Sequence, residues 1–204
     1  MNTTTAGSKA IKTAITALGF ALGVWISPTL AQPQVTEPAP APLEAIATLD
    51  VPRYMGTWYE IAKYPNWFQK KCVSNTSAQY TAEASGSLTV LNRCQKADGS
   101  MSEALGAAKQ VGSATSAKLE VRFAPAWLSF LPFVWGNYWV IDLDEQYQLA
   151  AVSEPTRKYL WILARTKTVD PKVYDALLQR LQQKGFNLNE IERSLQTDAP
   201  STTK

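Results

Sequence analysis

The stretch Gly56-Thr57-Trp58-Tyr59-Glu60 decides the fold together with Leu160-Trp161-Ile162-Leu163-Ala164-Arg165 further along the chain. Both stretches are rich in the aromatic and branched residues that favour strands. If they are the first and last strands of a closed sheet, Arg165 can cover Trp58 in a cation–π contact. The two stretches therefore predict a β-barrel whose sealed end is covered by this pair.

Short strands with turn signals between them dominate the chain from Leu49 onward. The turns include Asp144-Glu145-Gln146 and Glu154-Pro155-Thr156. Eight successive strands with tight connections predict an all-β, up-and-down antiparallel barrel, which leaves no free sheet edge. A sandwich of two sheets is the alternative. We place the strands at residues 55–64, 72–82, 87–95, 101–111, 116–124, 136–144, 146–153 and 158–166.

One C-terminal α-helix is predicted to pack on the barrel wall. Asp170 is placed to cap this helix, Pro171 to start it, and Gly185 to lie just past its end. A short final strand is expected over residues 191–195. The packing face of the helix is an apolar stripe of Val173, Leu177 and Leu181, with Tyr174, Leu178 and Gln182 beside it.

Residues 1–31 follow the order of a secretory signal peptide. Lys9 and Lys12 precede an apolar stretch from Ala14 to Ile26, and small residues end at Ala31. The apolar stretch is shorter than the roughly 20 residues that a membrane span needs, although an uncleaved anchor is the alternative. No cysteine follows the expected cleavage site, so anchoring through an N-terminal lipidated cysteine is not expected. We predict export to a periplasm, the cell envelope or the medium.

The rest of the chain is expected to hold one domain. Residues 32–48 are rich in proline, which favours extended polyproline II and predicts a semi-rigid linker. Residues 49–196 carry the predicted strands and the helix. The polar residues 197–204 are expected to form a disordered tail.

Composition excludes several classes of function. Residues 1–31 hold two lysines and no acid, so their removal leaves 18 basic and 17 acidic residues, a net charge of +1. A nearly neutral chain has no electrostatic footprint for nucleic acid. The chain has no histidine, and we find no nucleophile–base pair, phosphate loop or metal-ligand cluster. The sequence therefore predicts a binding protein without metal or cofactor and not an enzyme.

Two cysteines in an exported protein are more often bonded than free. Cys72 and Cys94 flank a predicted turn at residues 82–86. Pairing residues whose numbers sum to 166 sets Cys72 opposite Cys94 and Ala78 opposite Leu88, within disulfide reach. Two reduced and separately buried thiols are the alternative.

The interior of an eight-stranded barrel holds either packed side chains or one small ligand. Large aromatic residues with a few polar groups among them suit an apolar pocket with an orienting hydrogen bond, although they could equally fill a core. On the last strand the inward positions are Tyr159, Trp161 and Leu163. On the sixth strand Trp139, Ile141 and Leu143 are expected to share one face.

Three segments resemble the signatures of the lipocalin family. Residues 54–61 match the first signature, residues 138–143 with Asp144 and Tyr147 are similar to the second, and residues 160–165 are similar to the third. The resemblance runs from about residue 49 to residue 196. It is greatest to the group of bacterial outer-membrane lipocalins, plant temperature-induced lipocalins and apolipoprotein D.

This resemblance implies an eight-stranded calyx that is closed at one end and open at the other. Trp58 would lie across the closed end under Arg165, and Gly56 would allow close backbone approach. These three residues are structural in this interpretation. The positions that match the pocket of the apolipoprotein D type are Tyr80, Asn92, Phe123, Trp139 and Trp161.

The resemblance also implies a function. We expect binding, storage or transport of a fatty acid, lysophospholipid or related lipid, in cell-envelope lipid maintenance or stress protection. One alternative is a carrier of a carotenoid, bilin or other isoprenoid. Another is an enzyme acting on an isoprenoid or lipid, in which Glu60 would be the acid–base residue.

Residues 123–135 form an uncharged, aromatic-rich run between two predicted strands. An exposed loop of this kind marks a membrane or partner contact. The expected membrane-contact residues are Trp127, Phe130, Phe133 and Trp135. A loop folded back onto the barrel wall is the alternative.

Overall fold

The computed structural model describes residues 40–83 and 87–197. The predicted signal peptide, residues 32–39 of the predicted linker, residues 84–86 of the predicted turn and residues 198–204 of the predicted tail lie outside these residues. The described strands are β1 Gly56–Lys63, β2 Cys72–Ala82, β3 Leu88–Lys96, β4 Met101–Gln110, β5 Lys118–Arg122, β6 Gly136–Leu143, β7 Leu149–Ser153, β8 Leu160–Ala164 and β9 Glu192–Arg193. The helices are α1 Val51–Tyr54 and α2 Pro171–Gln183, with 3-10 turns η1 Ala126–Leu128, η2 Pro132–Val134 and η3 Leu188–Glu190.

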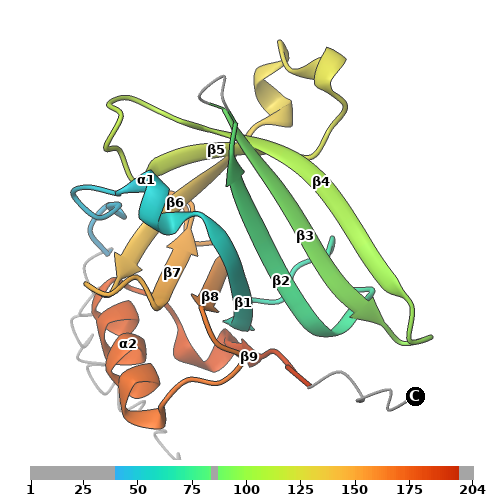
Figure 1. The fold of residues 1–204 in the computed structure, drawn as a ribbon. Helices are drawn as coiled ribbons and strands as arrows, with labels where there is room; N and C mark the ends of the chain where they lie inside the picture. The colour runs from blue at the N-terminus through green and yellow to red at the C-terminus, as the bar shows by residue number, and fades with distance from the viewer. Residues whose placement is uncertain (1–39, 84–86, 198–204) are drawn as a thin grey trace, which may run out of the picture. The chain divides into compact units, whose positions relative to one another are not determined.

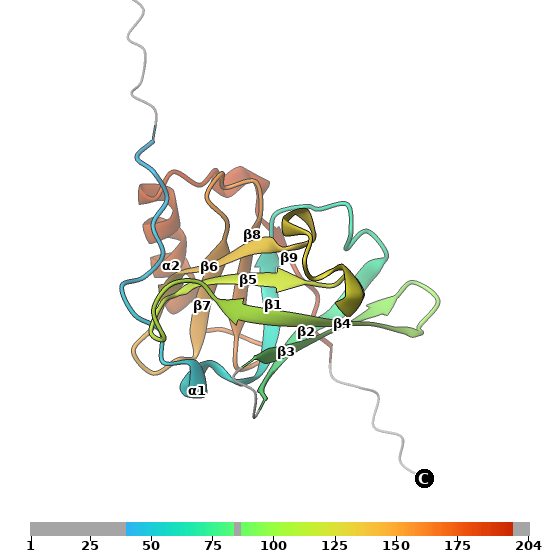
Figure 2. The same cartoon turned by 90° about the horizontal axis from the view of Figure 1, so that it is seen from above.

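The predicted eight-stranded barrel is confirmed. Strands β1 to β8 pair with their neighbours in chain order, and β1 pairs antiparallel with both β2 and β8, which closes the ring (Figure 1). Strand β9 lies outside the ring and pairs with β1 alone. Figure 2 shows α2 outside the ring of strands.

The helix α2 begins and ends where the sequence predicts. The carboxylate of Asp170 accepts hydrogen bonds from the backbone of Lys172 and Val173. Leu177 and Leu181 are fully buried, as expected, but Val173 is 49% exposed. Its predicted place is taken by Tyr174, which is buried under the helix.

The disulfide between Cys72 and Cys94 is confirmed, with 5.4 Å between the two Cα atoms. The predicted register was wrong, because Ala78 lies opposite Asn92 and not opposite Leu88. Two register shifts between Cys72 and Ser77 change how the residues of β2 pair with those of β3. Asn75, which lies in this stretch, adopts a positive φ of 53°. The cysteines therefore meet diagonally and not as direct cross-strand partners.

Two apolar clusters stabilise the barrel, one inside it and one between its wall and α2. The inner cluster contains Trp58, Tyr80 and Leu163, and the outer cluster contains Ile162 and Leu177. Residues 40–49 also lie against the barrel, since Leu43 is buried in the outer cluster. The backbone N–H groups of Ile46 and Leu49 donate to the carbonyls of Val140 and Thr115.

Residues 194–197, which we call the C-terminal segment, lie where β1 and β2 separate. Gln196 donates from Nε2 to the carbonyls of Glu60 on β1 and Thr76 on β2, at 2.8 Å each. The backbone N–H of Asn75 donates to the carbonyl of Leu195, and the N–H of Thr197 donates to the Asn75 side chain. This segment therefore completes the wall where the β1–β2 pairing ends.

The closed end of the barrel is held by Arg165. Its guanidinium carbon lies 3.9 Å from the centroid of the fully buried Trp58 ring. The same group donates to the carbonyls of Arg53 (2.8 Å), Thr57 (3.0 Å) and Tyr147 (3.3 Å). Gly56 has a φ of +92°, and a Cβ there would lie 3.4 Å from Nη1 of Arg165.

Replacing Arg165 with methionine should lower the free energy of unfolding by about 2–4 kcal/mol, because the variant loses a cation–π contact and three charged donors. Urea denaturation measures this change. The matched control is R93M, because Arg93 forms a surface ion pair with Glu103 and its loss should cost less than about 1 kcal/mol. Equal losses in the two variants would contradict the role of Arg165.

Candidate ligand-binding site

The open end of the barrel lies opposite Trp58. Neighbouring strands alternate in direction, so the loops after β1, β3, β5 and β7 meet at one end. These four loops, residues 64–71, 97–100, 123–135 and 154–159, define the mouth. Loops 64–71 and 123–135 lie across it from each other, because β1 and β5 are four strands apart in the ring.

The inner face of β4 carries only small side chains. The residues on this face alternate along the strand and are all small: Ser102, Ala104, Gly106 and Ala108. Ala108 is buried at the closed end, whereas Ala104 is exposed. The lower half of the barrel is therefore filled by side chains, while the upper half is accessible to solvent; we call this upper half the calyx. The alternating small residues were the sequence signal for it, and the sequence analysis missed them.

Three tyrosines form the floor of the calyx: Tyr54 and Tyr80 are buried, and Tyr138 is half-buried. The Tyr138 hydroxyl is hydrogen-bonded to those of Tyr54 at 2.9 Å and Tyr80 at 2.7 Å. Each hydroxyl carries one proton, and two hydrogen bonds use two of the three. The remaining proton is available to a water or to a polar atom of a ligand. Tyr80 is among the predicted ligand residues, but Tyr54 and Tyr138 are not.

The floor is uncharged at neutral pH. Burial raises the pKa of Tyr80 to about 12. Burial also raises the pKa values of Tyr54 and Tyr138 well above their usual range. Both neighbouring tyrosines add to the shift of Tyr138, whereas the hydrogen bond with Tyr138 opposes the shift of Tyr54. A neutral, aromatic floor with a hydroxyl donor suits an apolar ligand that carries few polar atoms.

The structure places four of the five predicted ligand residues on the inner side of the barrel. Besides Tyr80, Asn92 is half-buried opposite Ala104, and its side-chain amide has no hydrogen-bond partner within residues 40–83 and 87–197. The Phe123 ring covers Gly106, where a Cβ would lie 2.7 Å from it. The half-buried Trp161 packs against the inner cluster.

Trp139 lies elsewhere, and its predicted face was wrong. Its ring packs against the outer cluster, with Lys118 Nζ 4.3 Å from the ring centroid. A register shift between Val140 and Asp142 changes which side of the sheet the following residues face. Leu143 therefore joins the inner cluster, whereas Ile141 lies with Trp139 in the outer one, although the sequence pattern placed all three on one face.

Aromatic side chains gather at the mouth. The rings of Trp67, Phe68, Tyr159 and Trp161 follow one another at centroid distances of 5.6, 5.6 and 5.8 Å. Trp67 is 72% exposed. Trp67 and Phe68 belong to loop 64–71 and were not among the predicted site residues.

Loop 123–135 exposes three of its four predicted contact residues. Trp127, Phe130 and Phe133 are 73%, 75% and 79% exposed. Trp135 instead lies against the wall, where its indole donates to the Ser129 carbonyl and Lys109 Nζ lies 4.3 Å from its ring centroid. Within the part of the chain that the structure describes, no helix has the length and apolar character to cross a membrane.

Glu60 is buried, and both of its carboxylate oxygens are occupied. They accept hydrogen bonds from Gln69 Nε2 at 2.7 Å and Ser194 Oγ at 2.6 Å. Burial raises the pKa of Glu60, while these hydrogen bonds and the charge of Lys63 oppose the shift. The described residues contain no group of three or more potential metal ligands. Glu60 on β1 thus connects this strand to loop 64–71 through Gln69 and to the C-terminal segment through Ser194.

In a comparison with known protein families, residues 49–196 match the lipocalin-like domain. The chain is 38% identical over 160 residues to temperature-induced lipocalin-1 of Arabidopsis thaliana, covering 78% of this chain and 85% of that protein. It is 36% identical over 153 residues to the outer membrane lipoprotein Blc of Escherichia coli K12, covering 74% and 82%. It is 32% identical over 158 residues to mouse apolipoprotein D, covering 74% and 79%.

A solved structure shows the same fold. Insecticyanin from the tobacco hornworm Manduca sexta superposes with a TM-score of 0.61 at 17% identity, covering 80% of this chain and 88% of that protein. The resemblance identified from the three signatures is thus confirmed by whole-domain comparison.

The tyrosine floor makes stability fall at high pH. The pKa of Tyr80 is about 12 in the folded protein and 10.0 without burial, so its stabilising effect is complete below pH 10 and is lost as the pH rises from 10 towards 12. Urea midpoints measured across this range should decline less steeply in Y80F than in the wild type. The control Y159F changes a tyrosine outside the floor and should keep the wild-type slope. The same slope in all three proteins would contradict the argument.

Proposed function

Because the chain belongs to the lipocalin-like family, whose members bind small hydrophobic molecules, we propose that it binds and carries a lipid with a long acyl chain. A fatty acid, a lysophospholipid or a related lipid would place its chain in the calyx. The observation that carries this proposal is the small-residue inner face of β4, with Ala104 exposed, above a neutral aromatic floor.

The energetics of the calyx suit this class of ligand. Each buried methylene gives about 0.8 kcal/mol, so a long acyl chain offers a gross gain of roughly 10 kcal/mol. Ordering of the chain and loss of its free motion remove a large share, which leaves an affinity on the order of micromolar. Asn92 and the unused hydroxyl proton of the floor supply the few polar contacts that orient such a ligand.

The role is binding and not catalysis in this proposal. The floor tyrosines stay protonated at neutral pH, and Glu60 is engaged through both oxygens by Gln69 and Ser194. Neither group is therefore available as a general base in the calyx.

We place this function in an exported protein that contacts membranes. The Cys72–Cys94 bond is stable in oxidising compartments, and one relative is an outer membrane lipoprotein. The exposed aromatic side chains at the mouth would bring the calyx against a lipid surface. A relative named temperature-induced lipocalin supports a role in lipid maintenance under stress.

The first test is to identify the ligand and to block the calyx. Native mass spectrometry of protein purified without detergent, followed by solvent extraction, should show an acyl lipid. A104W fills the calyx and should abolish the adduct, because Ala104 faces inward. The matched control L105W changes the adjacent residue on the outer face, which is 67% exposed, and should keep the adduct.

Other outcomes would redirect the proposal. A coloured isoprenoid or bilin in the extract would replace the acyl lipid with a pigment. A wild-type protein that carries no adduct and binds no added acyl ligand would overturn the carrier function. Binding that survives A104W would place the ligand outside the calyx.

The mouth should bind lipid vesicles through its aromatic loop. The triple variant W127S/F130S/F133S removes three exposed rings and should reduce co-sedimentation with vesicles by about tenfold or more, since each ring contributes apolar contact area. V173S is the control, because Val173 is exposed on α2 at a site away from the mouth. Equal vesicle binding by the triple variant and the wild type would contradict membrane contact.

A further inference from the structure

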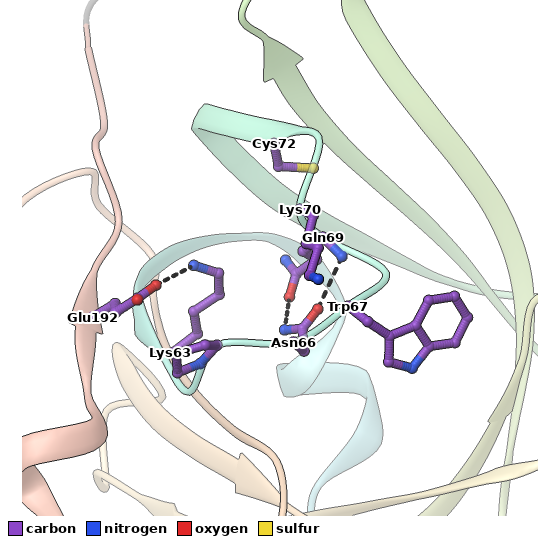
Figure 3. A pocket seen from close by; sticks show the side chains of 8 residues that line it. Lys63, Asn66, Trp67, Gln69, Lys70, Cys72 and Glu192 are labelled. Atoms are coloured by element: carbon purple, nitrogen blue, oxygen red, sulfur yellow. Dashed lines mark hydrogen bonds and ion pairs between the residues drawn. The ribbon is translucent and has the colours of Figure 1, made fainter.

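A polar recess lies at the mouth of the calyx, where β1 ends (Figure 3). Its volume is about 380 Å³. Its walls come from the end of β1, loop 64–71, the start of β2 and β9. The lining residues are Lys63, Pro65, Asn66, Trp67, Gln69, Lys70, Cys72 and Glu192.

The recess contains more positive than negative charge. Lys63 and Lys70 supply two ammonium groups, and Glu192 supplies one carboxylate. Lys63 Nζ lies 3.5 Å from Glu192 Oε2, and these side chains are 16% and 59% exposed. Lys70 has no ion-pair partner in the described part of the chain. One positive charge is therefore left without a counter-charge in the lining.

The recess is connected to the calyx through shared side chains. Lys63 lies opposite Trp161 in the β1–β8 ladder, so both face the inner side of the barrel. Gln69 lines the recess, and its Oε1 accepts a hydrogen bond of 3.0 Å from the indole of Trp161. A ligand chain that passes Trp161 thus reaches the rim at the level of Lys63.

We propose that this recess binds the anionic headgroup, a carboxylate or a phosphate, of the lipid whose acyl chain lies in the calyx. Lys63 and Lys70 are its charge partners, and Glu192 is an internal competitor for Lys63. This inference rests on the proposed function, since it names the polar end of the same ligand.

The geometry of the Lys63–Glu192 pair fits exchange for a ligand anion. The pair is held at 3.5 Å by a largely exposed carboxylate, and such pairs contribute little stability. A headgroup oxygen that contacts both ammonium groups makes charge-assisted hydrogen bonds to two cations instead of one. The anion should therefore displace Glu192, which can turn into solvent.

The test compares ligands with one acyl chain and different headgroups. Titrations followed by tryptophan fluorescence use palmitic acid, palmitoyl lysophosphatidic acid and monopalmitoylglycerol, which is neutral. At low salt the wild type should bind an anionic ligand about tenfold more tightly than the neutral one. The anion with the larger preference, carboxylate or phosphate, identifies the source.

Variants separate the recess from the calyx. K63M and K70M should each reduce the preference for the anionic ligand while leaving the affinity for monopalmitoylglycerol unchanged. K70M keeps the experiment valid if K63M folds poorly, because Lys70 is exposed and makes no ion pair in the described residues. E192Q removes the competitor and should increase anion affinity by about threefold. K172M, an exposed lysine on α2, is the control and should change nothing.

Failure of this inference can be told apart from failure of the carrier proposal. Equal binding of all three lipids, unchanged in K63M and K70M, would overturn the headgroup recess and leave the carrier function standing. Weaker anion binding in E192Q would also overturn it, because Glu192 would then assist and not compete. No binding of any of the three lipids would overturn the carrier function itself.

Discussion

The contact between Arg165 and Trp58 is the constraint on which the rest of the structure depends. One guanidinium covers the indole at 3.9 Å and donates to three carbonyls, which belong to α1, β1 and the β6–β7 turn. A single side chain after β8 thus connects the start and the end of the ring. With this end sealed, the aromatic rings and the lysines of the mouth lie at the opposite end, where the proposed ligand would enter.

The interior of the barrel changes in side-chain size and polarity along the barrel axis. Near the seal, large side chains and the tyrosine floor fill the barrel and provide its packing energy. Towards the mouth, the inward residues of β4 are small, and the Phe123 ring covers Gly106. The floor hydroxyls are neutral, and burial raises the pKa of Tyr80 to about 12. Lys70, which has no ion-pair partner among the described residues, lies at the rim. This order matches an amphipathic ligand with its chain inside and its polar end outside.

Much of the fold could be predicted from the sequence because the signals for it are local. Strand patterns, the Asp170 cap and the three signatures gave the barrel, the helix and the family. Register shifts carry no such signal: the shift between Val140 and Asp142 puts Leu143 inside while Trp139 and Ile141 lie outside, and those after Cys72 moved the hairpin pairing. The hydroxyl contacts of Tyr138 and the Lys63–Glu192 pair join residues far apart in the chain, so only the closed barrel brings them together.

The C-terminal segment has a consequence for the order of assembly. Leu195, Gln196 and Thr197 supply the hydrogen bonds that complete the wall where β1 and β2 separate. A chain that emerges from the ribosome N-terminus first therefore has the β1–β2 pair early but an incomplete wall until its last described residues appear. During that interval the apolar inner surface can be reached from the side as well as from the mouth. Completion of the wall in this sense depends on residues 195–197 and not on the strands alone.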